Sequence, residues 1–221
     1  MNDLALWNRR TDRRAWMVTA AGAALLGPAA SHAQAQWPTR PVRFVVPFVP
    51  GGTSDIVART TANELTRLLG SPVVIDNKAG GGGLPAMQEV GRAPADGHTL
   101  ILGHVGSLAV NPYIFANTGY YVNRDFAPVT LLAKVPSLFV IHPDVPAHTL
   151  AEFVAHVKRN PGRLNYASAG NASAGHLAME YLKMASGIFI THIPYRGTGP
   201  QLTDLLAGRT QASSAGLPAL L

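Results

Sequence analysis

Short apolar runs alternate along the chain with longer segments whose apolar residues recur every three or four positions. The short runs predict buried strands at 42–48, 73–76, 99–103, 129–133, 137–142, 164–167 and 188–193. The periodic segments predict helices at 55–69, 84–92, 173–186 and 200–206, and a further helix from Thr149 to just before Pro161. This alternation predicts an α/β fold with mainly parallel sheets that helices cover.

The first 35 residues have the layout of an export signal. Basic residues precede an apolar stretch at 15–30, and small residues follow it; the basic residues are Arg9, Arg10, Arg13 and Arg14. The segment resembles a twin-arginine signal, and the Sec route is the alternative. The apolar stretch is too short and too rich in glycine and alanine to favour a permanent membrane span. Cleavage after Ala35 would leave 186 residues in the periplasm.

Composition narrows the function classes. Beyond residue 35 the chain has 14 basic and 10 acidic residues, and no basic stripe with interleaved aromatic residues, so a nucleic-acid partner is not expected. The chain has no cysteine and no His-x-x-x-His pair, so neither disulfides nor the commonest metal sites are predicted, and no cofactor is expected. The mild positive charge suits a small anionic ligand.

One segment stands out for its chemistry. An apolar strand ends at Pro50-Gly51-Gly52, and a helix begins directly afterwards with Thr53, Ser54 and Asp55. The N–H groups at a helix start attract anions, and glycines let a ligand approach the backbone. The segment therefore favours a carboxylate or phosphate site, although an ordinary strand-to-helix turn has the same pattern.

Small polar residues and glycines follow three further predicted strands, at 77–83, 103–107 and 168–173. Ligands of parallel sheets collect at the carboxyl ends of strands, so these loops and 50–55 predict a shared cleft. Each loop alone is weak evidence, because glycine-rich turns are common in any α/β protein.

An ordered set of motifs runs from about Trp37 to about Gly208. It resembles the Bug family, the TctC-like extracytoplasmic solute-binding proteins of tripartite tricarboxylate transport systems. The motifs are Trp37-Pro38-x-Arg40-Pro41-Val42-Arg43, Val46-Pro47-Phe48-x-Pro50-Gly51-Gly52-x-x-Asp55, Asp76-Asn77-Lys78-x-Gly80, Ala95-Asp96-Gly97-His98-Thr99-Leu100, Asn111-Pro112, Asn165-Tyr166-Ala167-Ser168, Gly175-His176-Leu177 and Pro194-Tyr195-Arg196-Gly197.

The resemblance implies a two-domain periplasmic-binding-protein architecture of the Venus flytrap type, with domains at 36–136 and 137–221. It implies capture of a small organic carboxylate in the periplasm, without catalysis, for the membrane subunits of a tripartite tricarboxylate-type transporter. A monomer is expected. A signalling role with a sensor kinase is the alternative, and the sequence does not separate the two roles.

The resemblance also implies a binding site shared by the two domains. The first domain would contribute Phe48, Gly51, Gly52, Thr53, Ser54, Asp55 and Ser107, and the second Asn171, Ala172, Ser173 and His176. Phe48 would cover apolar carbons of the ligand.

Several of these residues also have plainer interpretations. The resemblance has Asp55 order the turn, but Asp55 could instead only cap the helix or pair with Arg59, and His176 could make a structural hydrogen bond. The run Gly80–Gly83 could be a flexible loop, and Arg196 could contact the ligand or bridge the domains.

The end of the chain departs from the family pattern. Residues 209–221 lack the β-branched strand and the acidic turn that relatives have there, which predicts a C-terminally truncated chain with uncovered sheet edges. A non-functional truncated copy is therefore a further alternative. A secreted hydrolase that uses Ser168 or Ser173 with His176 is disfavoured, because no Gly-x-Ser-x-Gly motif is present.

Overall fold

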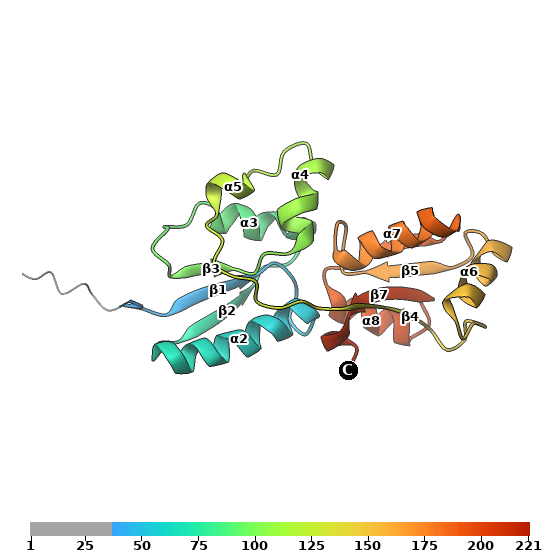
Figure 1. Ribbon diagram of the computed structural model, residues 1–221, viewed down its shortest axis with the longest axis horizontal. Helices are drawn as coiled ribbons and strands as arrows, with labels where there is room; N and C mark the ends of the chain where they lie inside the picture. Colours follow the sequence, from blue (N-terminus) through green and yellow to red (C-terminus); the bar gives the residue numbers. More distant parts are fainter. Residues whose placement is uncertain (1–36) are drawn as a thin grey trace, which may run out of the picture. The chain divides into compact units, whose positions relative to one another are not determined.

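The computed structural model describes residues 37–221. These residues contain two β-sheets, each with helices on both faces (Figure 1). Residues Arg40–Leu221 form one compact unit. The export signal predicted at 1–35 lies outside the described residues. Among those that are described, no helix has the length and apolar character needed to cross a bilayer.

The first sheet has the strand order β2-β1-β3 and is parallel throughout. Its strands are β1 (Val42–Val46), β2 (Val73–Asn77) and β3 (Thr99–Ile101). Phe44 of β1 lies in register between Ile75 and Leu100, and it packs in a core with Val46, Ala58, Ala62 and Leu102. Helices α2 (Thr53–Leu69) and α3 (Leu84–Val90) lie on opposite faces of this sheet. Shorter elements follow: η1 (Gly81–Gly83), η2 (Gly106–Val110), α4 (Asn111–Ile114) and α5 (Val122–Asp125).

The second sheet has the strand order β4-β7-β5-β6. Only the pairing of β4 with β7 is antiparallel. The strands are β4 (Ser137–Ile141), β5 (Asn165–Ser168), β6 (Thr191–Pro194) and β7 (Ala212–Gly216), and η3 (Leu217–Ala219) follows the last one. Helices α7 (Ala174–Ser186) and α8 (Thr198–Leu206) cover opposite faces, and α6 (Leu150–Arg159) packs beside α7. The core of this sheet includes Phe153, Val157, Tyr166, Met179 and Ile190.

The α/β class and the mainly parallel sheets predicted from the sequence are confirmed. Several predicted helix ends are close to the observed ones, and local caps explain two of them. Thr149 caps α6, its Oγ1 accepting the N–H of Glu152 at 3.2 Å. Gly70 ends α2 in the left-handed conformation, and its N–H donates to Thr66 O at 3.1 Å.

Two strand predictions need correction. The strand predicted at 129–133 is wrong: this apolar segment pairs with no sheet among the described residues, and Val129 and Leu131 are 81% and 70% exposed. The strand predicted at 188–193 is displaced. Ile188 and Ile190 are buried in the core but precede β6, which begins at Thr191.

The expectation that the end of the chain lacks a strand is also wrong. Strand β7 is hydrogen-bonded on both sides, to β4 and to β5. Its small residues suit a central position because α7 and α8 pack closely on its two faces. A Cβ on Gly175 of α7 would lie 2.1 Å from Ser214 O, while Gln201 of α8 donates to Ser214 O and to the hydroxyl of Ser213. Bulky β-branched residues would not fit there.

The two sheets lie on either side of residue 136, where the sequence places a domain boundary. Their residues nevertheless belong to one unit, so the division into domains at 36–136 and 137–221 stays a prediction.

Candidate functional site

A cavity of about 470 Å³ lies at the carboxyl ends of five strands. Three of them, β1, β2 and β3, belong to the first sheet, and two, β5 and β6, belong to the second. Ligands of parallel sheets bind in this position. Residues of the loops and short helices that follow strands of the first sheet form what we call the first wall: Pro47, Phe48, Ala79, Gly80, Gly81, Gly82, Gly83, Pro85, His104, Gly106 and Phe115. Residues from the second sheet form the second wall: Ala169, Gly170, Asn171, Ala172, Ser173, Pro194, Tyr195 and Arg196.

Four consecutive glycines shape much of the first wall. Gly80, Gly81, Gly82 and Gly83 have φ values of +116°, +53°, +65° and +85°, a region that side chains disfavour. Asn111 anchors the run, its Nδ2 donating to Gly82 O at 2.9 Å. A Cβ on Gly83 would lie 3.1 Å from Pro47 Cβ. The run thus has a defined backbone shape, and it exposes main chain to the cavity.

His104 is the titratable side chain of the first wall. Its Nδ1 accepts the N–H of Gly106 at 3.0 Å, and its ring lies edge-on to Phe48 with 5.2 Å between centroids. Ser107 holds the loop from beneath, its Oγ donating to His104 O at 3.1 Å. Burial lowers the pKa of His104 to about 4, so the ring is neutral at pH 7.

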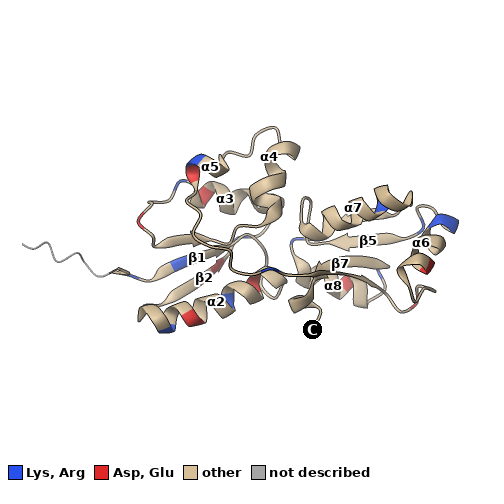
Figure 2. Ribbon diagram, viewed as in Figure 1, with Lys and Arg blue, Asp and Glu red and all other residues tan. Residues whose placement is uncertain are grey.

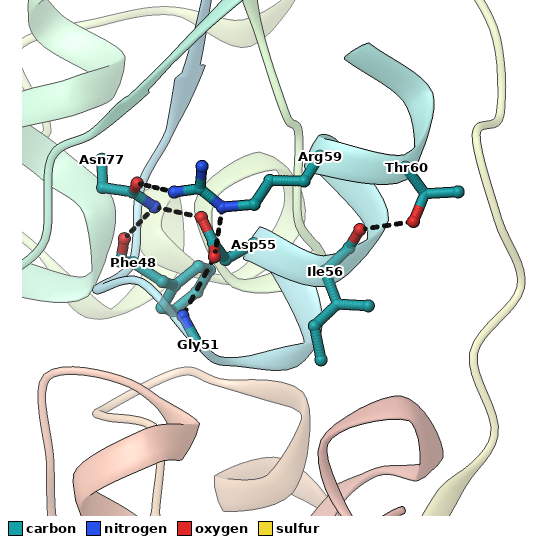
Figure 3. Close-up of polar contacts among 7 residues, drawn as sticks. All are labelled: Phe48, Gly51, Asp55, Ile56, Arg59, Thr60 and Asn77. Carbon is teal, nitrogen blue, oxygen red and sulfur yellow. Dashed lines mark hydrogen bonds and ion pairs between the residues drawn. The ribbon is translucent and has the colours of Figure 1, made fainter. Parts of the chain in front are cut away.

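The Pro-Gly-Gly turn is ordered by one buried carboxylate (Figure 3). Asp55 is 3% exposed, and it accepts hydrogen bonds from Gly51 N at 3.0 Å, Arg59 Nε at 2.8 Å and Asn77 Nδ2 at 2.9 Å. Asn77 Nδ2 also donates to Phe48 O, which ties the turn to the cavity. Burial alone would raise the pKa of Asp55, but the hydrogen bonds from Arg59, Gly51 and Asn77 outweigh it and lower that pKa. The ordering of the turn by Asp55 and its pairing with Arg59 are observed, whereas Asp55 does not cap α2, whose start has no side-chain cap.

The start of α2 lies against the second-sheet half of the unit rather than against the cavity. A Cβ on Gly52 would lie 3.3 Å from Thr198 Cβ at the start of α8. Thr53 Oγ1 donates to Gly216 O at 3.3 Å, and Val49 N donates to Arg196 O at 3.4 Å. Neither α2 nor α8 has a side-chain cap, so two uncapped helix starts meet here.

The second wall depends on side chains beneath it. Ala172 has φ +62°, strained for a residue with a Cβ, and its N–H donates to His176 Nδ1 at 3.2 Å. The His176 ring stacks on His192 at 4.2 Å, and His192 stacks on Tyr166 at 4.7 Å. Ser173 caps α7, its Oγ accepting the N–H of His176 at 3.2 Å.

Burial, and secondarily the neighbouring His176, lower the pKa of His192 to about 4. Burial also lowers the pKa of His176. Both rings are therefore neutral at pH 7, which allows His176 Nδ1 to act as the acceptor for Ala172.

The residues considered for a hydrolase are not arranged as a catalytic pair. Ser168 Oγ lies 2.6 Å from Nε2 of His192, not of His176, but Ser168 is 0% exposed and also bonds to Gly170. Ser173 contacts the backbone N–H of His176 rather than its ring. A substrate carbonyl has no access to the Ser168 hydroxyl.

The site residues expected from the sequence divide into two groups. Phe48, Asn171, Ala172 and Ser173 line the cavity. The others do not line it: Gly51, Gly52, Thr53, Ser54 and Asp55 form the start of α2, Ser107 is buried beneath His104, and His176 supports Ala172 from below.

Sequence reasoning missed His104 and Phe115 and left Arg196 undecided. The rule for strand ends identified the loop at 103–107, but a histidine beside a glycine carries no signal of its own. Phe115 follows α4, for which no pattern was recognised.

The cavity lining carries one ionised side chain at pH 7, that of Arg196, and neither Asp nor Glu. Within 37–221 the Arg196 guanidinium has no ion-pair partner. Elsewhere acidic and basic residues occur together on the same elements, as on α2, α5 and α6 (Figure 2). No group of three metal-ligating side chains occurs in this described range. The lining thus favours a small anion.

A second, smaller cavity of about 230 Å³ opens among β4, α6, α7 and β7. Its lining is mostly apolar and includes Phe139, Phe153 and Met179. Its lining contains no Asp, Glu, Lys or Arg, so it offers less to an anionic ligand than the larger cavity with Arg196.

The profile of the family described as "TctC: Tripartite tricarboxylate transporter family receptor" matches residues 57–221. The protein BugT of Bordetella pertussis is 36% identical over 199 residues, which are 90% of this chain and 61% of BugT. The solved structure "R. palustris Rpa4515 with adipate" has a TM-score of 0.81 and 39% identity over 83% of this chain and 61% of that one.

The structure "MatC (Rpa3494) from Rhodopseudomonas palustris with bound malate" has a TM-score of 0.78 and 35% identity over 83% of this chain and 63% of that one. The matched part of this chain covers between 51% and 63% of the length of these relatives and of a further curated relative.

Proposed function

The chain belongs to the TctC family of tripartite tricarboxylate transporter receptors, as its motifs predicted, and from this membership we propose that it captures a small organic carboxylate in the periplasm. It would deliver this ligand to the membrane subunits of a transporter of the same type. The family is described as a receptor family, so the proposed role is binding without catalysis.

The observation that carries the proposal is the composition of the cavity. Arg196 offers a charged partner for a carboxylate, and the glycine run offers main-chain groups at close range. No acidic side chain lines the cavity to repel an anion. The adipate and malate held by two structural neighbours are small organic acids of the proposed class.

Binding would involve movement of the two predicted domains toward each other. We include the start of α2 and the start of α8 in this mechanism, because the two lie in contact and neither has a side-chain cap, which leaves backbone N–H groups for an anionic ligand. The predicted site residues that do not line the cavity would act there: Gly51, Gly52, Thr53 and Ser54.

Gly52→Val tests this proposal. Gly52 has φ −94°, which valine tolerates, but the added side chain would meet Thr198 and keep the two helix starts apart. We expect binding of organic acids to the purified chain, measured by calorimetry, to fall by at least about tenfold, which is about 1.4 kcal/mol.

Gly70→Ala is the matched control. Gly70 ends α2 at φ +63° with no atom within 4 Å of the added Cβ, so this variant loses about 1 kcal/mol of stability but keeps its affinity. Unchanged affinity in Gly52→Val would contradict the role proposed for the start of α2. Absence of binding to any organic acid by the parent chain would contradict the proposed function itself.

A further inference from the structure

We propose that His104 is a specificity-determining residue of the cavity, presenting one fixed, uncharged N–H donor that selects a monocarboxylate bearing a hydroxyl or carbonyl oxygen over a dicarboxylate of the same length. The inference rests on the proposed function, since it names the class of acid that this same site prefers.

The first step is the tautomer of the ring. Nδ1 of His104 accepts the N–H of Gly106 at 3.0 Å, and a nitrogen that accepts a hydrogen bond cannot also carry a proton. A neutral His104 therefore carries its proton on Nε2. Within the described chain, Nε2 has no hydrogen-bond partner, and the ring is part of the cavity lining. The Nε2–H group is thus available to a ligand.

The second step is the rigidity of this donor. Both backbone groups of His104 bond to the Ser107 hydroxyl, at 3.3 Å for N and 3.1 Å for O, and the ring packs edge-on against Phe48. Gly106, which donates to the ring, packs closely on the second wall, since a Cβ at that position would lie 2.4 Å from Ala172 O. A donor that is held before binding loses little conformational freedom on binding, and it discriminates by position.

The third step is charge. The other titratable side chains that line the cavity are Tyr195 and Arg196, and neither is an acid that would favour a charged imidazole. Burial keeps His104 neutral down to a pKa of about 4. A second ligand carboxylate placed at His104 would therefore be dehydrated next to an uncharged ring, with no opposite charge from that ring to compensate. A hydroxyl or carbonyl oxygen at the same place would lose much less hydration free energy.

Matched pairs of acids test the inference, each pair differing only by the replacement of one carboxylate with CH₂OH. The pairs are 6-hydroxyhexanoate with adipate, and 2,4-dihydroxybutyrate with malate. In titration calorimetry at pH 6.5, we expect each hydroxy acid to bind at least about tenfold more tightly than its diacid partner. Titrations in two buffers of different ionisation enthalpy should reveal no proton uptake.

Two variants identify His104 as the source of the preference. His104→Phe keeps a ring but removes the donor, so we expect the preference for the hydroxy acids to shrink to about twofold or less. His104→Gln supplies another uncharged N–H donor and should restore part of it. The ratio of two affinities is the readout because a general loss of folded protein does not change it.

His142 supplies the matched control. Its Nδ1 also accepts a backbone N–H two residues on, that of Asp144 at 3.2 Å, but His142 does not line the cavity. His142→Phe should keep the full preference for hydroxy acids.

Three results would overturn the inference. Tighter binding of the diacids with uptake of about one proton would make His104 a charged partner. An unchanged preference in His104→Phe would place its origin elsewhere and leave the proposed function standing. Failure of every acid to bind would overturn the proposed function and this inference together.

Discussion

The two walls of the cavity obtain their shape in different ways. The first wall relies on backbone conformation, with four left-handed glycines in succession and a histidine held by its own loop. The second wall relies on side chains, since a strained alanine is supported by a column of three stacked rings. A wall whose shape depends on backbone conformation should be disrupted by Cβ atoms added at its glycines. A wall supported by stacked rings should be weakened by protonation of its histidines and by loss of the helix cap beneath it.

Asp55→Ala tests a place where the first wall depends on a side chain, since Asp55 orders the turn that Asn77 ties to Phe48. The variant would leave the donors Gly51 N and Asn77 Nδ2 without the buried carboxylate that accepts from both. We expect the free energy of unfolding to fall by about 3 kcal/mol, measured by urea denaturation.

Arg59→Ala is the control for this change. Arg59 is half exposed, so its loss should cost less than about 1 kcal/mol. Equal losses in the two variants would mean that the ion pair, rather than the turn, stabilises this part of the first wall.

Gly106→Ala tests whether ligand binding requires the close contact between the two walls. A Cβ there would lie 2.4 Å from the carbonyl oxygen of Ala172, which is backbone and has little room to move. We expect ligand affinity to fall by about 2 kcal/mol, or about thirtyfold, in calorimetry.

Gly199→Ala adds a methyl group to another backbone position near the opposite half of the unit. Its nearest neighbour is Pro50 O at 3.7 Å, an ordinary contact, so affinity should stay unchanged. A similar loss in both variants would remove the special importance of the contact between Gly106 and Ala172.

Acid should weaken the second wall. The pKa of His192 is about 4 in the folded chain and about 6.5 when unfolded, so between these values the unfolded chain binds more protons. Stability is therefore fully present above about pH 6.5 and is lost as the pH falls toward 4. Allowing for the partial exposure of His192, we expect a loss of about 2 kcal/mol across this window.

His192→Phe keeps a ring in the stack but removes the titration, so its unfolding free energy should depend less on pH than that of the parent. His104 has the same lowered pKa, and His104→Phe should reduce the acid loss in the first wall independently. Identical pH profiles for the parent and His192→Phe would contradict the proposed origin of the acid sensitivity.

The sequence predicted the fold where local signals and packing agree. Apolar runs located β1 and β2, and the cap at Thr149 located α6. Prediction failed where tertiary contacts determine whether a segment forms a strand. The residues of β7 are alanines, serines and a glycine, a composition that hides a central strand, and they are needed because α7 and α8 pack tightly on both of its faces.

The same distinction holds for the candidate site. Glycine-rich loops at strand ends were visible in the sequence, and three of the four, at 77–83, 103–107 and 168–173, contribute to the cavity lining, whereas the loop at 50–55 does not. The tautomer of His104 and the support of Ala172 by His176 depend on hydrogen bonds within folded loops, which no spacing reveals.

Ser173→Ala has the smallest expected effect and separates stability from binding. Ser173 and Thr149 cap α7 and α6 in the same way, each accepting an N–H at 3.2 Å, but only Ser173 lines the cavity. We expect Ser173→Ala and Thr149→Ala each to lower the free energy of unfolding by about 1 kcal/mol. Only Ser173→Ala should also weaken ligand binding, because the cap that it removes positions the loop holding the strained Ala172. If Thr149→Ala weakened binding equally, the second wall would be responding to overall stability, and its dependence on the side chains beneath it would have to be abandoned.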